Sequence, residues 1–234
     1  MKLPLLVVAD GSIEALKWLA LLLMTGDHVN KYLLNGANPL LFNMGRMALP
    51  IFCFVLAYNL ARPNTLQRGV YTRTMSRLAL FGLAATPAFL ALGGLWAGWW
   101  PLNVLFTLLA ATAILLFIEQ GSRRSLTAAA AVFLCAGTSV EFWWPALSIC
   151  LAVWWYCRKP SLLALALLIT ACAALWFING NFWALAAVPV TVLATLTNFR
   201  LPRIKWLFYS YYPIHLTVLW LIRLQMMKAG YLFY

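Results

Sequence analysis

The sequence contains little charge. Asp, Glu, Lys and Arg together make up 9% of the 234 residues and only five residues are acidic, whereas 65% are hydrophobic and the mean hydropathy is +0.87. Soluble proteins usually carry about 25% charged residues, so the composition predicts an integral membrane protein. No long polar stretch interrupts the chain, which argues against a separate soluble domain. We therefore expect one transmembrane domain over residues 1–234.

The sequence also lacks closely spaced cysteines. Its five cysteines lie singly in or beside apolar segments, whereas metal sites and disulfide frameworks show characteristic close spacings. We therefore predict no metal site and no disulfide, and interpret these thiols as small buried hydrophobic groups. They are Cys53, Cys135, Cys150, Cys157 and Cys172.

The apolar segments lack the period-two alternation of membrane β-strands. Turn residues cut the chain into runs near the roughly 20 residues that a helix needs to cross a bilayer. The sequence therefore predicts an all-α integral membrane protein, a single bundle of about nine transmembrane helices. The predicted segments are residues 13–33, 44–61, 78–95, 102–118, 125–140, 142–156, 161–178, 182–197 and 206–224.

Basic residues are distributed unevenly between the predicted loops. Lys and Arg accumulate in cytoplasmic loops, and a cytoplasmic N-terminus with nine spans puts 13 of the 17 basic residues on the inner side. Topology and attraction to anionic lipids explain the net charge of +12, so we expect membrane lipids, and no nucleic acid, as partners. The inner-side residues are Lys2, Lys17, Arg62, Arg68, Arg73, Arg77, Arg123, Arg124, Arg158, Lys159, Arg200, Arg203 and Lys205.

Ionisable residues interrupt the first two apolar segments. Asp27 and His28 follow a very apolar run, and Arg46 opens the next segment. Such residues at membrane depth are costly and mark candidate functional sites inside a bundle. Neighbouring residues of a helix point in different directions, so we expect Asp27 to pair with Arg46 or with another helix rather than with His28. Lys17 lies about three turns before His28 and is expected on the same stripe.

Two prolines lie close to polar residues of predicted helices, one near Arg46 and one near His215. Pro50 is expected to kink the second helix and to free the carbonyl of Arg46. In the last helix, Tyr212 and His215 are three residues apart and share a face beside Pro213. We therefore consider Tyr212 and His215, the second of only two histidines, as further catalytic candidates.

The combined pattern resembles the TraX family of conjugative plasmids. The resemblance implies a multi-pass protein of the bacterial inner membrane, distantly similar to the acyltransferase-3 membrane proteins. It also implies an acetyltransferase that uses acetyl-CoA to acetylate the N-terminus of processed pilin, with His28 catalytic and Asp27 and Arg46 as its companions. The residues that carry it are Ala15-Leu16-Lys17-Trp18-Leu19-Ala20, Met24, Asp27-His28, Gly45-Arg46, Pro50, Phe52 and Tyr212-Pro213-Ile214-His215-Leu216.

This activity assigns distinct chemistry to the polar residues. An α-amino group has a pKa near 7.7 to 8.0 and must lose a proton to react, and a histidine is suited to accept it. We expect His28 to be the base, and Arg46 or a nearby amide or hydroxyl to stabilise the oxyanion. The phosphates of acetyl-CoA are expected at the basic inner loops. The residues predicted to bind them are Lys17, Arg62, Arg73, Arg77 and Arg203.

Three alternatives remain open at this point. Each basic residue can serve membrane topology alone. A secondary transporter would also place His, Asp and Arg in the core, and would be indicated by broken helices in two related halves; the helices of Pro50 and Pro213 lie in unlike contexts. A non-catalytic assembly factor of a conjugation system would need neither buried charge nor a cofactor pocket.

Overall fold

The computed structural model describes residues 3–93, 95, 97–204 and 206–233, and Lys2 and Lys205 lie outside this part. Within it the chain is all-helical, and no strand is formed. The elements are α1 (Asp10–Leu33), α2 (Pro39–Gly45), α3 (Ala48–Ala61), α4 (Val70–Leu92), α5 (Val104–Gln120), α6 (Arg123–Gly137), α7 (Trp143–Arg158), α8 (Leu162–Ala174), α9 (Trp176–Asn179), the 3-10 helix η1 (Trp183–Ala186), α10 (Ala187–Leu193) and α11 (Leu207–Lys228).

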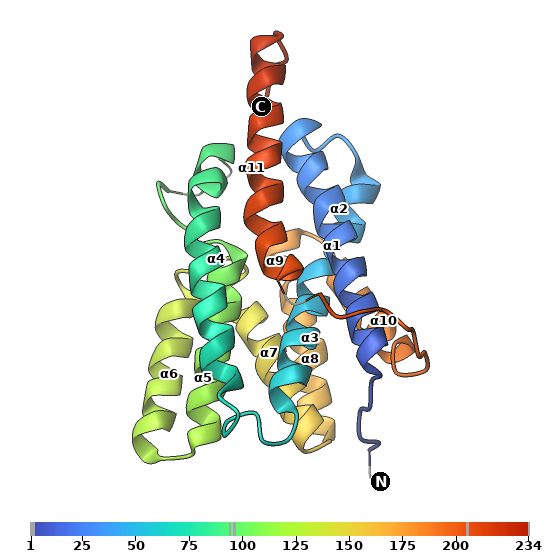
Figure 1. Cartoon of the computed structure of the whole chain (residues 1–234), viewed down its shortest axis with the longest axis vertical. Coiled ribbons are helices and arrows are strands. Elements are labelled where there is room, and N and C mark those ends of the chain that lie inside the picture. Colours follow the sequence, from blue (N-terminus) through green and yellow to red (C-terminus); the bar gives the residue numbers. More distant parts are fainter. Residues whose placement is uncertain (1–2, 94, 96, 205, 234) are drawn as a thin grey trace.

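The long helices run roughly along one common axis (Figure 1). The first helix, α1, packs against α2, α3 and α11, while α3 packs against α7 and α7 against α8. On the other side α11 lies along α4, and α5 lies between α4, α6 and α7. The last helix therefore joins the first helix to α4, although it comes from the opposite end of the chain.

Three helical stretches of the described chain are long and apolar enough to cross a membrane. They are Pro39–Ala61, Val70–Leu92 and Leu162–Asn179. Two more apolar helical stretches, Val104–Gln120 and Trp183–Leu193, are shorter. The prediction of an all-α protein is confirmed and its helices are suited to a membrane, while the count of nine spans and the cytoplasmic N-terminus stay predictions.

The second predicted helix differs from the structure. It begins at Pro39, because the side chain of Asn38 accepts hydrogen bonds from the amides of Leu40 and Leu41 and a proline fits the first helical position. It is then interrupted at Arg46 and Met47, before α3 begins. Pro50 lies in the first turn of α3, where an amide has no helical partner. The interruption lies at Arg46, whose carbonyl would have bonded the amide that Pro50 lacks. The helix is therefore disturbed where the sequence predicts it, and the predicted start at residue 44 is wrong.

The predicted helix at residues 182–197 is also shorter in the structure. It consists of η1 and α10 and ends at Leu193, and an irregular segment, residues 194–204, then crosses the start of α1. Ser12 donates a hydrogen bond of 2.6 Å to the Thr197 carbonyl. A Cβ on Gly11 would lie 1.6 Å from the Phe199 carbonyl oxygen, so Gly11 permits this close crossing.

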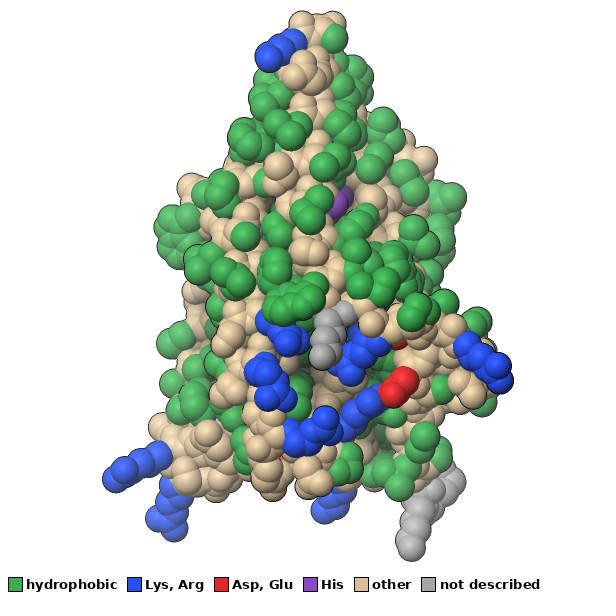
Figure 2. All heavy atoms as spheres, in the orientation of Figure 1, with side chains coloured by type: hydrophobic (Ala, Val, Ile, Leu, Met, Phe, Trp, Pro, Cys, Tyr) green, Lys and Arg blue, Asp and Glu red, His purple; other side chains and the backbone are tan. Residues whose placement is uncertain are grey.

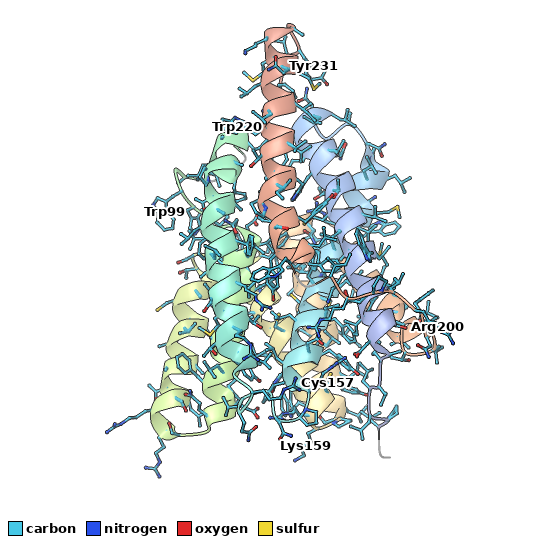
Figure 3. The ribbon with its side chains drawn as sticks, in the orientation of Figure 1. Trp99, Cys157, Lys159, Arg200, Trp220 and Tyr231 are labelled. Atoms are coloured by element: carbon cyan, nitrogen blue, oxygen red, sulfur yellow. The ribbon has the colours of Figure 1, made fainter. Side chains whose placement is uncertain are left out.

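Basic side chains gather towards one end of the molecule. In Figure 2 the blue side chains lie mostly over the lower half, with one at the upper tip. The N-terminus lies at the lower end (Figure 1), and Lys159 and Arg200 lie in the lower half of Figure 3, whereas Trp99, Trp220 and Tyr231 lie above them. The fold thus segregates basic residues in space, as a positive-inside topology requires.

Candidate active site

A cavity of about 520 Å³ lies between α1, the α2–α3 break, α9 and α11. Gly36 lines it and is exposed, so the cavity reaches the surface near the α1–α2 loop. Four of the five predicted catalytic residues line it, namely Asp27, His28, Arg46 and Tyr212. The fifth, His215, is buried beside His28. The polar lining residues are Asp27, His28, Asn30, Lys31, Tyr32, Asn35, Arg46, Glu141 and Tyr212.

The two histidines of the chain form a pair. His28 Nδ1 lies 2.8 Å from His215 Nε2, and the imidazole planes are within 8° of parallel. His215 Nδ1 lies 3.0 Å from the Tyr211 carbonyl oxygen. Because a carbonyl only accepts, His215 carries its proton on Nδ1, and its Nε2 accepts from His28 Nδ1. His28 Nε2 is therefore the nitrogen left with a free lone pair.

Aromatic side chains fix the orientation of both imidazoles. The rings of Tyr32 and Tyr212 have centroids 5.6 and 6.4 Å from that of His28. The Tyr212 and His215 centroids are 5.4 Å apart, which confirms that these residues share a face of α11. Tyr211 stacks on His215, and its hydroxyl lies 2.7 Å from the Thr25 hydroxyl. The histidine pair is thus held between α1 and α11 on several sides.

The pairing of Asp27 with Arg46 is confirmed. The Arg46 guanidinium donates from Nη2 to Asp27 Oδ2, and both side chains are almost buried. Its Nε donates to the Phe42 carbonyl at 3.1 Å and its Nη1 to Asn179 Oδ1 at 3.4 Å. Arg46 therefore ties α1, the α2–α3 break and α9 together. Of its five N–H groups, these contacts leave two for a substrate.

Glu141 and Tyr32 line the same cavity but were missed from the sequence. Glu141 is one of only five acidic residues and lies in an apolar stretch, so the rule applied to Asp27 and Arg46 would also have selected it. Tyr32 is one turn beyond His28 on α1. Residues four apart share one face of a helix, so this spacing could have predicted that Tyr32 lies beside His28.

The donor candidates lie away from this cavity. A second cavity of about 80 Å³ near the start of α1 is lined by Lys17, Arg62 and Arg203, together with the acidic Asp10 and Glu14. Lys17 bonds Glu14 at 2.7 Å and Arg62 bonds Asp10. Lys17 therefore does not line the cavity of His28, and its ammonium is paired with Glu14.

Arg73 and Arg77 lie one turn apart on α4. The guanidinium of Arg77 lies 4.9 Å from the Trp206 ring centroid and 5.7 Å from that of Tyr209, at the start of α11. The ammonium of Lys17 lies 4.9 Å from the Phe208 ring in the same turn. The first turn of α11 therefore brings basic residues of α1 and α4 to one level, while Arg73 is exposed beside them.

Together these features define a helical protein of the membrane type with a histidine pair and a buried ion pair around one polar cavity. The chain belongs to the TraX family: the family model described as TraX protein matches residues 12–223. It is 30% identical over 237 aligned residues to Protein TraX of Escherichia coli, covering 94% of this chain and 90% of that protein. The comparison with solved structures gave no match.

Gly45 provides a test of the ion pair. A Cβ on Gly45 would lie 2.4 Å from Asp27 Cβ and 2.9 Å from its Cγ, so Gly45→Ala must displace Asp27 from Arg46. Breaking a buried pair costs about 3–5 kcal/mol, and we expect a clear drop in the apparent melting temperature in detergent. Gly26→Ala is the matched control, because its Cβ would meet only the flexible end of Leu41, at 3.2 Å. Equal melting temperatures for the two variants would contradict a stabilising role of the pair.

Proposed function

We propose that this protein is an acetyltransferase of the bacterial inner membrane that transfers acetyl from acetyl-CoA to the N-terminal amine of processed conjugative pilin. The observation that carries the proposal is the histidine pair. His28 donates a hydrogen bond from its Nδ1–H to His215 Nε2, which leaves His28 Nε2 as a base beside a cavity. An oriented imidazole with one free lone pair is what removal of a proton from an amine requires.

The transfer then follows from this arrangement. The neutral amine attacks the carbonyl carbon of the thioester, and His28 Nε2 accepts the amine proton as the C–N bond forms. The positive charge on His28 is stabilised because His215 Nε2 accepts from its Nδ1–H. The tetrahedral intermediate collapses with cleavage of the C–S bond, and His28 returns its proton to the thiolate of CoA.

The developing oxyanion needs hydrogen-bond donors inside the cavity. The two N–H groups of Arg46 that protein contacts leave over are candidates, and so are the hydroxyls of Tyr32 and Tyr212 beside His28. Such donors are effective because they are held in fixed positions around the cavity before the negative charge develops. Asp27 acts through Arg46, since it holds the guanidinium in place.

The donor is assigned to the opposite, basic end of the bundle. Acetyl-CoA is polyanionic, and Arg73, Arg77 and Arg203 lie where basic side chains gather. Arg62 and Lys17 are neutralised by Asp10 and Glu14 and are weaker candidates. Lys17 is 11 residues before His28, or about 16 Å along α1, a span that the extended arm of the thioester is suited to bridge.

Substitution of the histidines tests the base. We expect His28→Ala to lower acetyl transfer by about 10²–10⁴-fold while the protein still accumulates in the membrane. His215→Ala should have a smaller effect, and His215→Gln should recover part of that loss, because a glutamine oxygen can accept from His28 Nδ1–H. Mass spectrometry of the pilin N-terminus in cells carrying each variant measures the outcome.

Three results would overturn these assignments. Near-normal acetylation with His28→Ala would exclude His28 as the base. If His215→Ala were as active as the parent, catalysis would not require the hydrogen bond from His28 Nδ1–H to His215. Absence of acetylation by the parent itself would favour a transporter or an assembly factor instead.

A charge-neutralised pair tests the donor site. Arg73→Gln with Arg77→Gln should weaken acetyl-CoA binding to purified protein by about five- to thirtyfold, as expected for two water-exposed ionic contacts. The matched control is Arg123→Gln with Arg124→Gln, a basic pair at the start of α6. Added salt should weaken binding to the parent. If both double variants bound acetyl-CoA with equal affinity, Arg73 and Arg77 would serve only the membrane topology.

The proposed orientation is tested by labelling. Single cysteines at Arg68, in the α3–α4 loop, and at Tyr231, beyond α11, are expected on opposite sides of the membrane, with Arg68 cytoplasmic. A membrane-impermeant thiol reagent applied to intact and to opened cells distinguishes the two sides, in a parent whose exposed Cys135 is replaced by Ser. Labelling of both positions from one side would reject an odd number of spans.

A further inference from the structure

The turn between α6 and α7 holds Glu141 at the cavity wall. The Glu141 amide donates to the Leu102 carbonyl at 2.9 Å, and the Leu102 amide donates to Ser139 at 2.8 Å. The Thr107 hydroxyl donates to the Glu141 carbonyl at 2.8 Å. The turn is thereby fixed to the loop before α5. The Glu141 backbone is fully engaged, so its carboxylate is the group that remains for the cavity.

The two residues after Glu141 have unusual backbone geometry. Phe142 and Trp143 have φ of 62° and 46°, and both line the cavity. Aromatic residues rarely adopt the left-handed region, and each such residue costs about 1–3 kcal/mol. Such strain concentrates where a side chain must be placed for function. The turn that presents Glu141 is therefore built at a cost in stability.

Among the residues that the structure describes, no Lys or Arg forms a salt bridge with the carboxylate of Glu141. Arg46 is engaged by Asp27, and the ammonium of Lys31 lies over the Tyr32 ring, 5.0 Å from its centroid. These two cations therefore act on the Glu141 carboxylate only at a distance, without an ion pair. A carboxylate in a mainly apolar cavity is costly without a counter-charge.

We propose that Glu141 binds the N-terminal ammonium of the acceptor chain and holds it beside His28, an inference that rests on the proposed acetyl transfer. Glu141, Tyr32 and Tyr212 line the same cavity as His28, and the rings of the two tyrosines flank His28. A cation paired with Glu141 therefore lies in the cavity that the base lines. Glu141 is a recognition residue, distinct from the base.

The remaining wall suits the residues that follow the ammonium. Leu49 and Phe52 of α3, Phe89 of α4, and Phe177 and Ile178 of α9 line the cavity. These side chains offer apolar surface to the first side chains of a peptide. The acceptor class is therefore an apolar peptide with a free α-amino group.

Proton balance is consistent with this placement. The bound ammonium has one proton too many for attack, and in a cavity of low polarity a neutral amine and carboxylic acid compete with an ion pair. Glu141 accepts that first proton. His28 Nε2 accepts the second as the C–N bond forms and passes it to the departing thiolate, so the net proton released by acetylation of an ammonium leaves from Glu141.

Equilibrium binding tests the proposal without requiring catalysis. The probes are a fluorescent apolar hexapeptide that begins with alanine and the same peptide beginning with a propionyl group, which lacks only the amino group. At pH 7 we expect full-length parent protein to bind the amino peptide at least tenfold more tightly. Glu141→Gln should bind the two probes within twofold of each other. Glu119→Gln, which removes a carboxylate paired with Arg158 elsewhere in the bundle, should keep the tenfold preference.

Each outcome decides the proposal. A parent without preference, or a Glu141→Gln protein that keeps the preference, overturns it. If Glu141→Gln does not accumulate, Glu141→Asp decides: it supports the proposal when it prefers the amino peptide and overturns it when it binds both peptides alike.

The same proteins separate this proposal from that of acetyl transfer. Incubation of the amino peptide with acetyl-CoA and mass spectrometry of the product measures the reaction itself. Preference for the amino peptide without acetylation would refute the acetyltransferase and leave the ammonium site in place. Acetylation by the parent without any preference would refute only the role of Glu141.

Discussion

The ion pair between Asp27 and Arg46 is the interaction on which the site depends. It lies where α1 meets the interruption between α2 and α3, and Arg46 also reaches Asn179 of α9. Gly45 allows the approach, since a side chain there would occupy the position of Asp27. Charges at membrane depth are costly, and pairing with an opposite charge is one of the ways in which a bundle accommodates them. The pair therefore fixes three walls of one cavity and leaves that cavity polar at its base.

The histidine pair depends on a second constraint, the packing of the last helix along the first. The hydroxyl contact between Thr25 and Tyr211 and the stacking of Tyr211 on His215 set the register of α11 against α1. The Tyr211 carbonyl then determines which nitrogen of His215 carries the proton, and through it the tautomer of His28. A chain of hydrogen bonds from the backbone thus leaves a lone pair at His28 Nε2.

Local patterns predicted what lies close in sequence and failed where distant segments meet. The Asp27–Arg46 contact follows from two adjacent helices that share one side of the membrane, and it was predicted. The contact of His28 with His215 spans 187 positions, and no periodicity specifies which face of α11 meets α1. The start of α2 at Pro39 was missed because the cap at Asn38 begins a helix earlier than hydropathy indicates. Glu141 was missed because the predicted segments treated its turn as a boundary.

The molecule separates two kinds of charge between its ends. Basic side chains gather at the end that holds the N-terminus, while the cavity beyond the middle of α1 contains a paired arginine and the carboxylate of Glu141. A polyanion is attracted to the first region and a cation to the second. His28 lies on the cavity side of this division. In the proposed reaction, two substrates of opposite charge would approach from opposite ends of the bundle and meet at this imidazole, so that the separation of charge along α1 would give each substrate its direction of approach.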